Sequence, residues 1–142
     1  RMSRTFKRSK IFNADSKKIL FLINNFEAYQ DFLPGCLESS ELPCQEDGSA
    51  SGRLVFSILD KTYEFKSLNR TEDLVVNIIQ SEGPFINFNA SWKLEPINSQ
   101  DTKVNFEATF SLPFFLKIFA QQSLIDQLGL KFIAAFEDQL KR

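Results

Sequence analysis

Hydrophobic and polar residues alternate with a period of two along two stretches in the second half of the chain, 86–96 and 103–112. In the first stretch the apolar positions run from Ile86 to Leu94, and in the second they run from Val104 to Leu112. Such alternation is typical of antiparallel strands that bury one face and expose the other. These stretches predict two neighbouring strands with one shared buried face.

Shorter runs of β-branched and aromatic residues predict five further strands. We expect the polar pair Asp60-Lys61 to turn the chain between two of them and so to form a hairpin. The five predicted strands are Arg4–Phe12, Leu37–Gln45, Gly52–Leu59, Thr62–Arg70 and Leu74–Gln80.

Three segments have the apolar spacing of helices. One begins just after Asp15, which is placed to cap it, and a short one covers Tyr29–Phe32 and ends at Pro34-Gly35. The third is predicted as one long helix from Pro113 to about Lys141. On a helical wheel its apolar stripe contains Phe114, Phe115, Ile118, Ile125, Leu128, Phe132, Ile133, Phe136 and Leu140.

The resulting order, β-α-α-β6-α, predicts an α+β fold with residues 1–142 as one domain. A seven-stranded antiparallel sheet must cover its apolar face, and the long C-terminal helix is the available cover. A curved sheet wrapped on one helix leaves a gap that can hold a ligand. The 16 Phe residues either fill this gap as a dense core or line it as a cavity.

Two features near the C-terminal helix bear on this choice. Gly129 lies on the apolar stripe, where glycine is unfavourable, so it serves either a close helix–sheet approach or room for a ligand. Gln121 and Gln122 interrupt the stripe, and their amides either bind a ligand carbonyl or face water.

Composition excludes several kinds of chemistry. With no His, the chain cannot form a Ser-His-Asp or Cys-His relay, and a zinc site lacks its usual ligands. Cys36 and Cys44 would lie roughly 26 Å apart on one extended strand, so we expect two free thiols in a reducing compartment. No catalytic or metal site is predicted.

Charge and hydropathy limit the partners. The net charge of −1 argues against a DNA-binding protein. Residues 1–18 hold seven Lys or Arg and one Asp, a local charge of +6 that either contacts anionic lipid or RNA or keeps an edge strand soluble. No apolar stretch is long enough to span a membrane, so we expect a cytoplasmic protein, peripheral at most to the inner membrane.

Four short motifs occur in a fixed order: YQDFLPGC (29–36), SEGPF (81–85), SWKLEP (91–96) and TKVNFEATFSLP (102–113). Their order and spacing resemble the coenzyme Q-binding, START-like family. This branch of the polyketide cyclase/dehydrase superfamily includes mitochondrial coenzyme Q-binding proteins and bacterial RatA-like proteins. The resemblance covers the chain from about Ser3 to Leu140.

The resemblance implies a helix-grip fold with a hydrophobic tunnel for a ubiquinone-like or other isoprenoid lipid. We expect the sheet and the last helix to supply its walls, and the YQDFLPGC segment to form its lid or entrance. The predicted wall residues are Phe56, Phe65, Phe85, Phe88, Trp92, Phe106, Phe110, Ile125, Phe132 and Phe136. The predicted lid residues are Tyr29, Phe32, Leu33 and Pro34.

Three functions remain for comparison. We expect a lipid carrier or chaperone that supports respiration, with a hydrophobic small molecule as its partner and no catalysis. The alternative implied by the RatA-like relatives is a ribosome-associated inhibitor of subunit association, for which the basic first segment is the local support. An enzyme of the cyclase kind ranks last because the chain lacks His.

Overall fold

The computed structural model describes residues 2–142, with all side chains in this range except those of Met2, Ile118 and Phe119. Seven strands and three α-helices, with two short 3-10 helices (η), follow one another in the predicted order. They are β1 Met2–Phe12, α1 Ser16–Asn24, η1 Phe26–Ala28, α2 Tyr29–Phe32, β2 Cys36–Leu42, β3 Ala50–Ile58, β4 Lys61–Glu72, β5 Val75–Glu82, β6 Asn87–Pro96, β7 Thr102–Leu112, η2 Phe114–Phe119 and α3 Gln122–Gln139.

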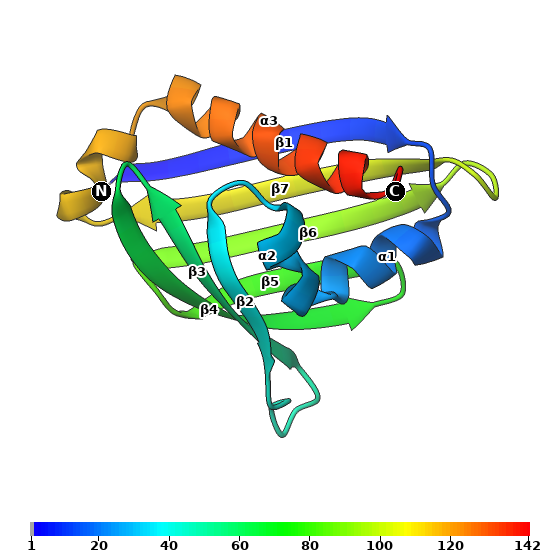
Figure 1. Ribbon diagram of the computed structural model, residues 1–142, viewed down its shortest axis with the longest axis horizontal. Helices are drawn as coiled ribbons and strands as arrows, with labels where there is room; N and C mark the ends of the chain where they lie inside the picture. The colour runs from blue at the N-terminus through cyan, green and yellow to red at the C-terminus, as the bar shows by residue number, and fades with distance from the viewer. Residues whose placement is uncertain (1) are drawn as a thin grey trace.

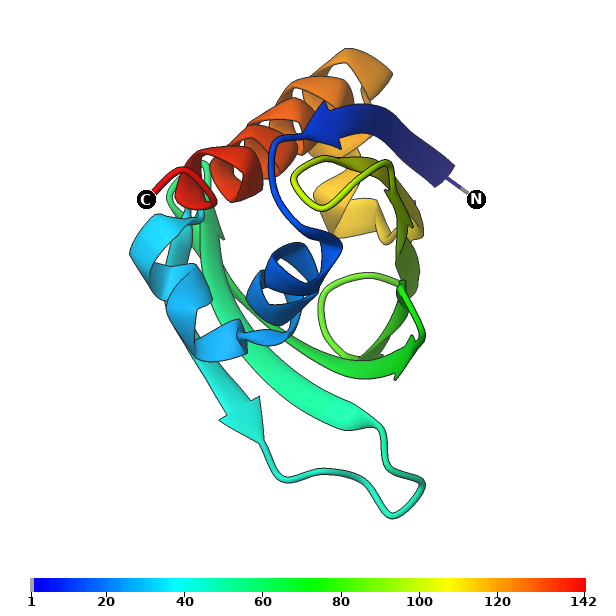
Figure 2. The ribbon, with the colours of Figure 1, turned by 90° about the vertical axis from the view of Figure 1, so that its right-hand side faces the viewer.

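The strands form one antiparallel sheet in the order β1-β7-β6-β5-β4-β3-β2, so β1 and β2 are its edges. The sheet is strongly curved, and α1 and α3 both lie on its concave side (Figure 1 and Figure 2). This arrangement confirms the predicted helix-grip fold.

The alternating pattern positions the core as expected. Ala90 pairs with Ala108 and Trp92 pairs with Phe106 across β6 and β7, and all four side chains are buried. At the opposite end of β7, the buried Thr102 hydroxyl donates to the Ala14 carbonyl at 2.8 Å and so ties β7 to the start of α1.

The predicted cap of α1 is also confirmed. The side chain of Asp15 accepts a hydrogen bond from the backbone N–H of Lys17 at 3.2 Å. An oxygen acceptor at this position satisfies one of the N–H groups that the first helical turn leaves without a partner.

The prediction of one continuous helix from Pro113 to Lys141 is wrong. Gln121 is extended (φ −73°, ψ 125°) and separates η2 from α3. Because the two helices do not share one axis and one periodicity, a single helical wheel drawn through both assigns the residues before Gln121 to the wrong face. Phe114 and Phe115 are 84% and 68% exposed rather than buried, and among the described side chains of η2 it is Leu116 that packs inward.

The hairpin between β3 and β4 also turns one residue earlier than predicted. Ile58 pairs with Lys61, so the two-residue loop is Leu59-Asp60 rather than Asp60-Lys61. Both loop residues have positive φ, 50° and 66°.

Gly129 marks the closest approach of α3 to the sheet. A Cβ atom at this position would lie 2.5 Å from two ring carbons of Phe6 on β1. The close-approach explanation for this glycine is therefore confirmed.

We predict that Gly129→Ala lowers the free energy of unfolding by about 1–3 kcal/mol, the range for overpacked cores. The new Cβ would overlap three ring atoms of Phe6, so the ring must leave its packed position, and this cost outweighs the roughly 1 kcal/mol of helix propensity that alanine gains. Chemical denaturation measures the change. Ala134→Gly on the exposed side of α3 is the matched control for propensity alone, and a more stable Gly129→Ala variant would contradict the close contact.

Candidate functional site

A cavity of about 250 Å³, here called the inner cavity, lies between the concave face of the sheet and α3. Among the described side chains on its wall, the hydroxyl of Tyr63 is the one polar group. The wall residues are Phe6, Phe56, Ile58, Tyr63, Pro84, Phe85, Phe88, Phe106, Ala108, Phe110, Leu112, Leu116, Ile125, Leu128, Gly129 and Phe132.

Two small residues lie on the wall next to Phe6. Ala108 is the cross-strand partner of Phe6, and Gly129 touches the ring of Phe6 from α3. Ala108 projects only a methyl group toward the inner cavity, whereas the space in front of Gly129 is taken by the ring of Phe6.

The aromatic rings at the β6–β7 end of the wall pack against one another rather than across the cavity. Phe85 lies 5.3 Å from Phe88 and 5.4 Å from Phe110 between ring centroids. These separations are typical of favourable aromatic pairs. The rings thus hold one another in place and leave the space between sheet and helix open.

Seven of the ten predicted wall residues lie on the wall of the inner cavity, whereas Phe65, Trp92 and Phe136 do not. Phe65 packs beneath the wall against Phe88 at 5.1 Å. Trp92 and Phe136 are each 1% exposed and contact each other at 4.9 Å. The seven residues on the wall are Phe56, Phe85, Phe88, Phe106, Phe110, Ile125 and Phe132.

The sequence reasoning missed several wall residues. Phe6 and Tyr63 point to the concave face of strands whose alternation is weak. Pro84 lies in the turn between β5 and β6, and Leu116 lies on η2, which the prediction of one long helix did not separate from α3. For Tyr63, its place two residues before Phe65 on the same face of β4 was a usable signal.

A second depression of about 510 Å³, here called the outer hollow, opens beside the inner cavity. The two share the wall residues Phe56, Ile58, Leu128 and Phe132. Its polar side chains among the described residues are Cys36, Ser57 and Lys131, and the rest of its wall is apolar apart from backbone.

The predicted lid residues divide into two groups. Leu33 and Pro34 line the outer hollow. Tyr29 is buried and Phe32 is half-buried, and both pack their rings on Phe136, at 5.4 Å and 5.1 Å between centroids. The first pair lies at the rim, and the second pair anchors α2 in the core.

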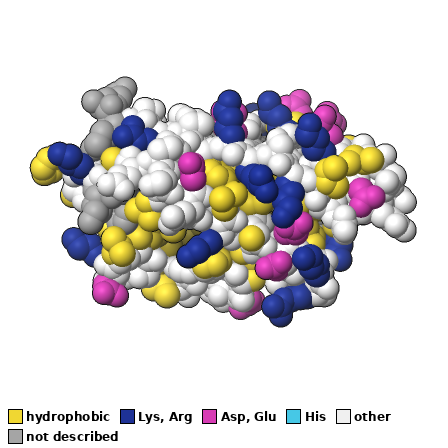
Figure 3. Space-filling model, turned by 90° about the horizontal axis from the view of Figure 1, so that it is seen from above, with side chains coloured by type: hydrophobic (Ala, Val, Ile, Leu, Met, Phe, Trp, Pro, Cys, Tyr) yellow, Lys and Arg dark blue, Asp and Glu magenta, His cyan; other side chains and the backbone are white. Residues whose placement is uncertain are grey.

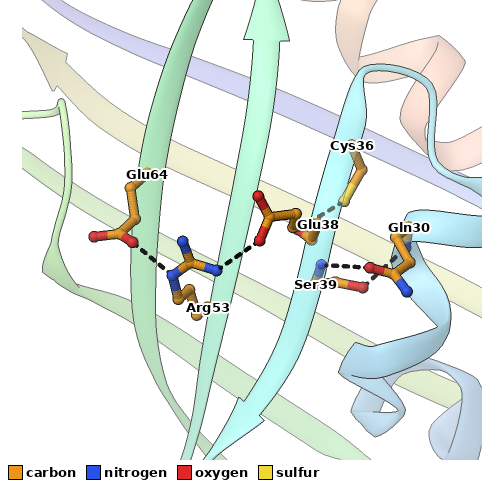
Figure 4. A network of polar contacts seen from close by, with 6 residues as sticks. All are labelled: Gln30, Cys36, Glu38, Ser39, Arg53 and Glu64. Carbon is orange, nitrogen blue, oxygen red and sulfur yellow. Dashed lines mark hydrogen bonds and ion pairs between the residues drawn. The ribbon is translucent and has the colours of Figure 1, made fainter.

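Polar contacts hold the rim to the sheet (Figure 4). The backbone N–H of Gln30 donates to the Ser39 hydroxyl at 2.9 Å, and the backbone N–H of Ser39 donates to the Gln30 side chain at 3.1 Å. Arg53 joins Glu38 on β2 to Glu64 on β4. These contacts join α2 to β2, and β2 to β3 and β4.

The titratable groups near the lid are suited to structure rather than to acid–base work. Burial raises the pKa of the Cys36 thiol, although a backbone hydrogen bond from Glu38 partly opposes the shift. Burial also raises the pKa of Tyr29 far above its usual value, and its hydroxyl donates to the carbonyl of Ile23. Both groups are neutral near pH 7.

Other residues considered from the sequence face water. Gln121 and Gln122 are exposed, and the Gln122 amide donates to the Thr5 carbonyl and to Asp126, each at 2.9 Å. Of the two explanations for these amides, the solvent-facing one is confirmed.

Within residues 2–142, no group of three or more His, Cys, Asp or Glu side chains is arranged to hold a metal ion. No helix in this range is long and apolar enough to cross a membrane. Both Cys residues are free thiols, as expected from the sequence.

Comparisons with known proteins agree with this architecture. A model of the family described as polyketide cyclase/dehydrase and lipid transport matches residues 13–137. The ribosome association toxin RatA of Escherichia coli (strain K12) is 23% identical over 142 residues, which cover 94% of this chain and 85% of that protein.

Solved structures share the fold at lower identity. A START superfamily protein from Mycobacterium smegmatis has a TM-score of 0.82 at 16% identity, with 96% of this chain and 97% of that chain covered. The Zhui aromatase/cyclase from Streptomyces sp. R1128 has a TM-score of 0.84 at 12% identity, with 99% and 94% covered.

We predict that iodoacetamide modifies Cys44 several-fold faster than Cys36 near neutral pH. A raised pKa leaves Cys36 with a smaller thiolate fraction, and the thiolate is the reacting form. The Cys36 rate should rise as the pH is raised toward that pKa. Peptide mass spectrometry follows both sites, with Cys36→Ser and Cys44→Ser as controls, and a faster Cys36 would indicate an activated nucleophile.

Proposed function

The chain belongs to the polyketide cyclase/dehydrase and lipid transport family, and we propose that it binds an isoprenoid lipid without catalysing its conversion. The observation that carries the proposal is the almost wholly apolar wall of the inner cavity. Burial of apolar surface contributes about 25 cal/mol per Å². A branched hydrocarbon chain gains this energy along its whole length and requires no polar partner.

The volumes of the inner cavity and the outer hollow suit an isoprenoid tail that is only partly enclosed by the protein. The inner cavity of about 250 Å³ exceeds the roughly 150 Å³ that accepts benzene in an engineered protein cavity. It lies somewhat below the lower limit of about 300 Å³ for sites that hold drug-sized ligands. We infer that the inner cavity takes the first isoprene units and that the remainder lies along the outer hollow.

A polyprenyl quinone of the ubiquinone type fits this division. Its head group carries carbonyl oxygens, which are hydrogen-bond acceptors. In the outer hollow, Ser57 and Lys131 supply donors within an otherwise apolar surface. We propose a carrier or chaperone for such a quinone, in support of respiration.

The wall chemistry supports binding over catalysis. General acid–base catalysis needs a titratable group within hydrogen-bond reach of the substrate. Among the described residues, the inner wall offers the phenol of Tyr63 and no carboxylate, amine or thiol. The aromatase/cyclase of similar structure shares this fold, but a shared fold does not imply that this cavity catalyses the same reaction.

A second candidate follows from the similarity to RatA, which is described as a ribosome association toxin. The local support is the basic strand β1, but two of its charges are engaged: Lys7 pairs with Glu107 and Lys10 with Glu137. Arg8 remains on the surface. Lipid binding therefore ranks first, and co-sedimentation with ribosomal subunits at moderate salt tests the alternative.

We predict that Ala108→Leu weakens binding of a short-chain ubiquinone at least about tenfold, because the longer side chain occupies the inner cavity. Quinone quenching of Trp92, the one tryptophan of the chain, reports binding. The indole ring lies 5.8 Å from the ring of the wall residue Phe132, close enough to sense the ligand. Thr109→Leu is the matched control, since it adds the same side chain on the outer face of β7.

Organic extraction of the purified chain followed by mass spectrometry identifies any retained ligand. We expect an isoprenoid quinone or a related lipid. Recovery of no lipid, together with no quenching by added ubiquinone, would contradict the proposed function.

A further inference from the structure

Large apolar side chains are exposed at one end of the molecule, on three segments that meet there. Phe114 and Phe115 lie on η2, Leu59 at the tip of the β3–β4 hairpin (65% exposed), and Ile86 just before β6 (53% exposed). These segments touch one another, because Leu116 of η2 packs in one cluster with residues of β4 and of the β5–β6 turn. We call Leu59, Ile86, Phe114 and Phe115 the apolar end.

The apolar end surrounds one end of the inner cavity. Ile58 and Tyr63 flank the hairpin loop that carries Leu59, Phe85 directly precedes Ile86, and Leu116 directly follows Phe115; all four line the cavity. In Figure 1 this is the left end of the molecule, where the hairpin tip, the β5–β6 turn and η2 come together. An apolar ligand entering here would pass the exposed apolar residues.

Leu59 combines an unfavourable backbone conformation with an exposed side chain. Two-residue hairpin loops with positive φ at both positions favour Asn-Gly or Asp-Gly, because a bulky side chain is strained there. Leu59 adopts φ 50° and yet leaves most of its side chain in water, so packing does not offset the strain. Backbone strain of this kind is concentrated at sites with a function.

η2 presents its aromatic rings from an anchored base. The buried side chain of Leu116 fixes the segment to the sheet, while Phe114 and Phe115 point outward. In a 3-10 helix residues three apart lie on the same side, which places Lys117 beside Phe114. An exposed aromatic ring next to a lysine is suited to the boundary between lipid tails and anionic head groups.

The charges around the apolar end are mainly positive. Lys61 follows the hairpin loop, Lys117 belongs to η2, and Lys131 lines the outer hollow; among the described residues none of the three has an ion-pair partner. The acidic residues nearby are Asp60 in the hairpin loop and Glu82 at the end of β5, and Glu82 pairs with Lys66. Figure 3 shows Lys or Arg side chains beside hydrophobic ones at this end of the face it presents. Since the whole chain carries −1, this local excess is not a property of the general surface.

We propose that the apolar end docks on an anionic lipid bilayer, with Phe114, Phe115 and Leu59 inserted among the lipids and Lys61 and Lys117 at the head groups. Docking in this orientation places the end of the inner cavity against the bilayer. The lipid cargo then moves between membrane and cavity without crossing water. The purpose of docking rests on the proposed function, whereas docking itself does not.

Vesicle flotation of the full chain tests the proposal. We expect the chain to float with vesicles of phosphatidylcholine mixed with phosphatidylglycerol and to bind less at high salt. The double variant Phe114→Ser/Phe115→Ser should lower the partition coefficient at least about tenfold, because it removes two apolar side chains from the lipid. Lys117→Gln should lower it by roughly fivefold on anionic vesicles, the effect of one cation near such a surface.

Phe21→Ser provides the matched control, because Phe21 is 71% exposed on α1, at the opposite end of the molecule. This variant should float like the wild type. Equal flotation of the η2 double variant, an equal loss with Phe21→Ser, or no flotation of the wild type would overturn the proposal. A dimer that the η2 substitutions dissociate, without vesicle binding, would also overturn it by assigning a second copy as the occupant.

Ubiquinone quenching of Trp92 in the absence of vesicles separates this proposal from the proposed function. We expect the η2 double variant to retain quenching, since Phe114 and Phe115 do not line the inner cavity. Loss of flotation with intact quenching supports docking by the apolar end. Intact quenching in a wild type that does not float leaves lipid binding standing and rejects docking.

Discussion

The contact of Phe132 and Phe136 with Trp92 is the interaction on which the rest of the structure depends. The ring centroids lie 5.8 Å and 4.9 Å apart and fix α3 against the concave face of the sheet. Trp92 and Phe136 are almost fully buried at this contact. On the other side of Phe132, the side chains of Phe110, Leu116 and Ile125 border the inner cavity. One helix therefore closes the core at one end and covers a cavity at the other.

The sequence predicts the strands and the buried face well, because alternation in β6 and β7 directly reports which side of a sheet is covered. The sequence cannot show that Trp92 is buried in the core whereas Phe110 lines the cavity, because both side chains point to the concave face. Only the path of α3 decides which of them is covered. The break at Gln121 was missed for a related reason. Apolar spacing across 113–121 fits a helix, but the chain must first cross from β7 to the concave side, and this requires a change of direction.

The fold alone does not determine function, because similar structures include an aromatase/cyclase as well as a START superfamily protein. The wall of the cavity is more informative. A cavity wall whose only described polar side-chain group is one phenol suits a hydrocarbon chain. The apolar end beside the cavity carries exposed apolar side chains as well, and the proposed membrane docking rests on them.

An isotope-filtered NOE spectrum of the ¹³C-labelled chain with unlabelled short-chain ubiquinone tests isoprenoid binding in the inner cavity. We expect contacts from the isoprenoid methyl groups to the rings of Phe110 and Phe132, which both line the inner cavity, and none to Thr109 on the outer face of β7. Contacts confined to the outer face of the sheet, or the absence of any contact to the cavity rings at saturating ligand, would contradict it.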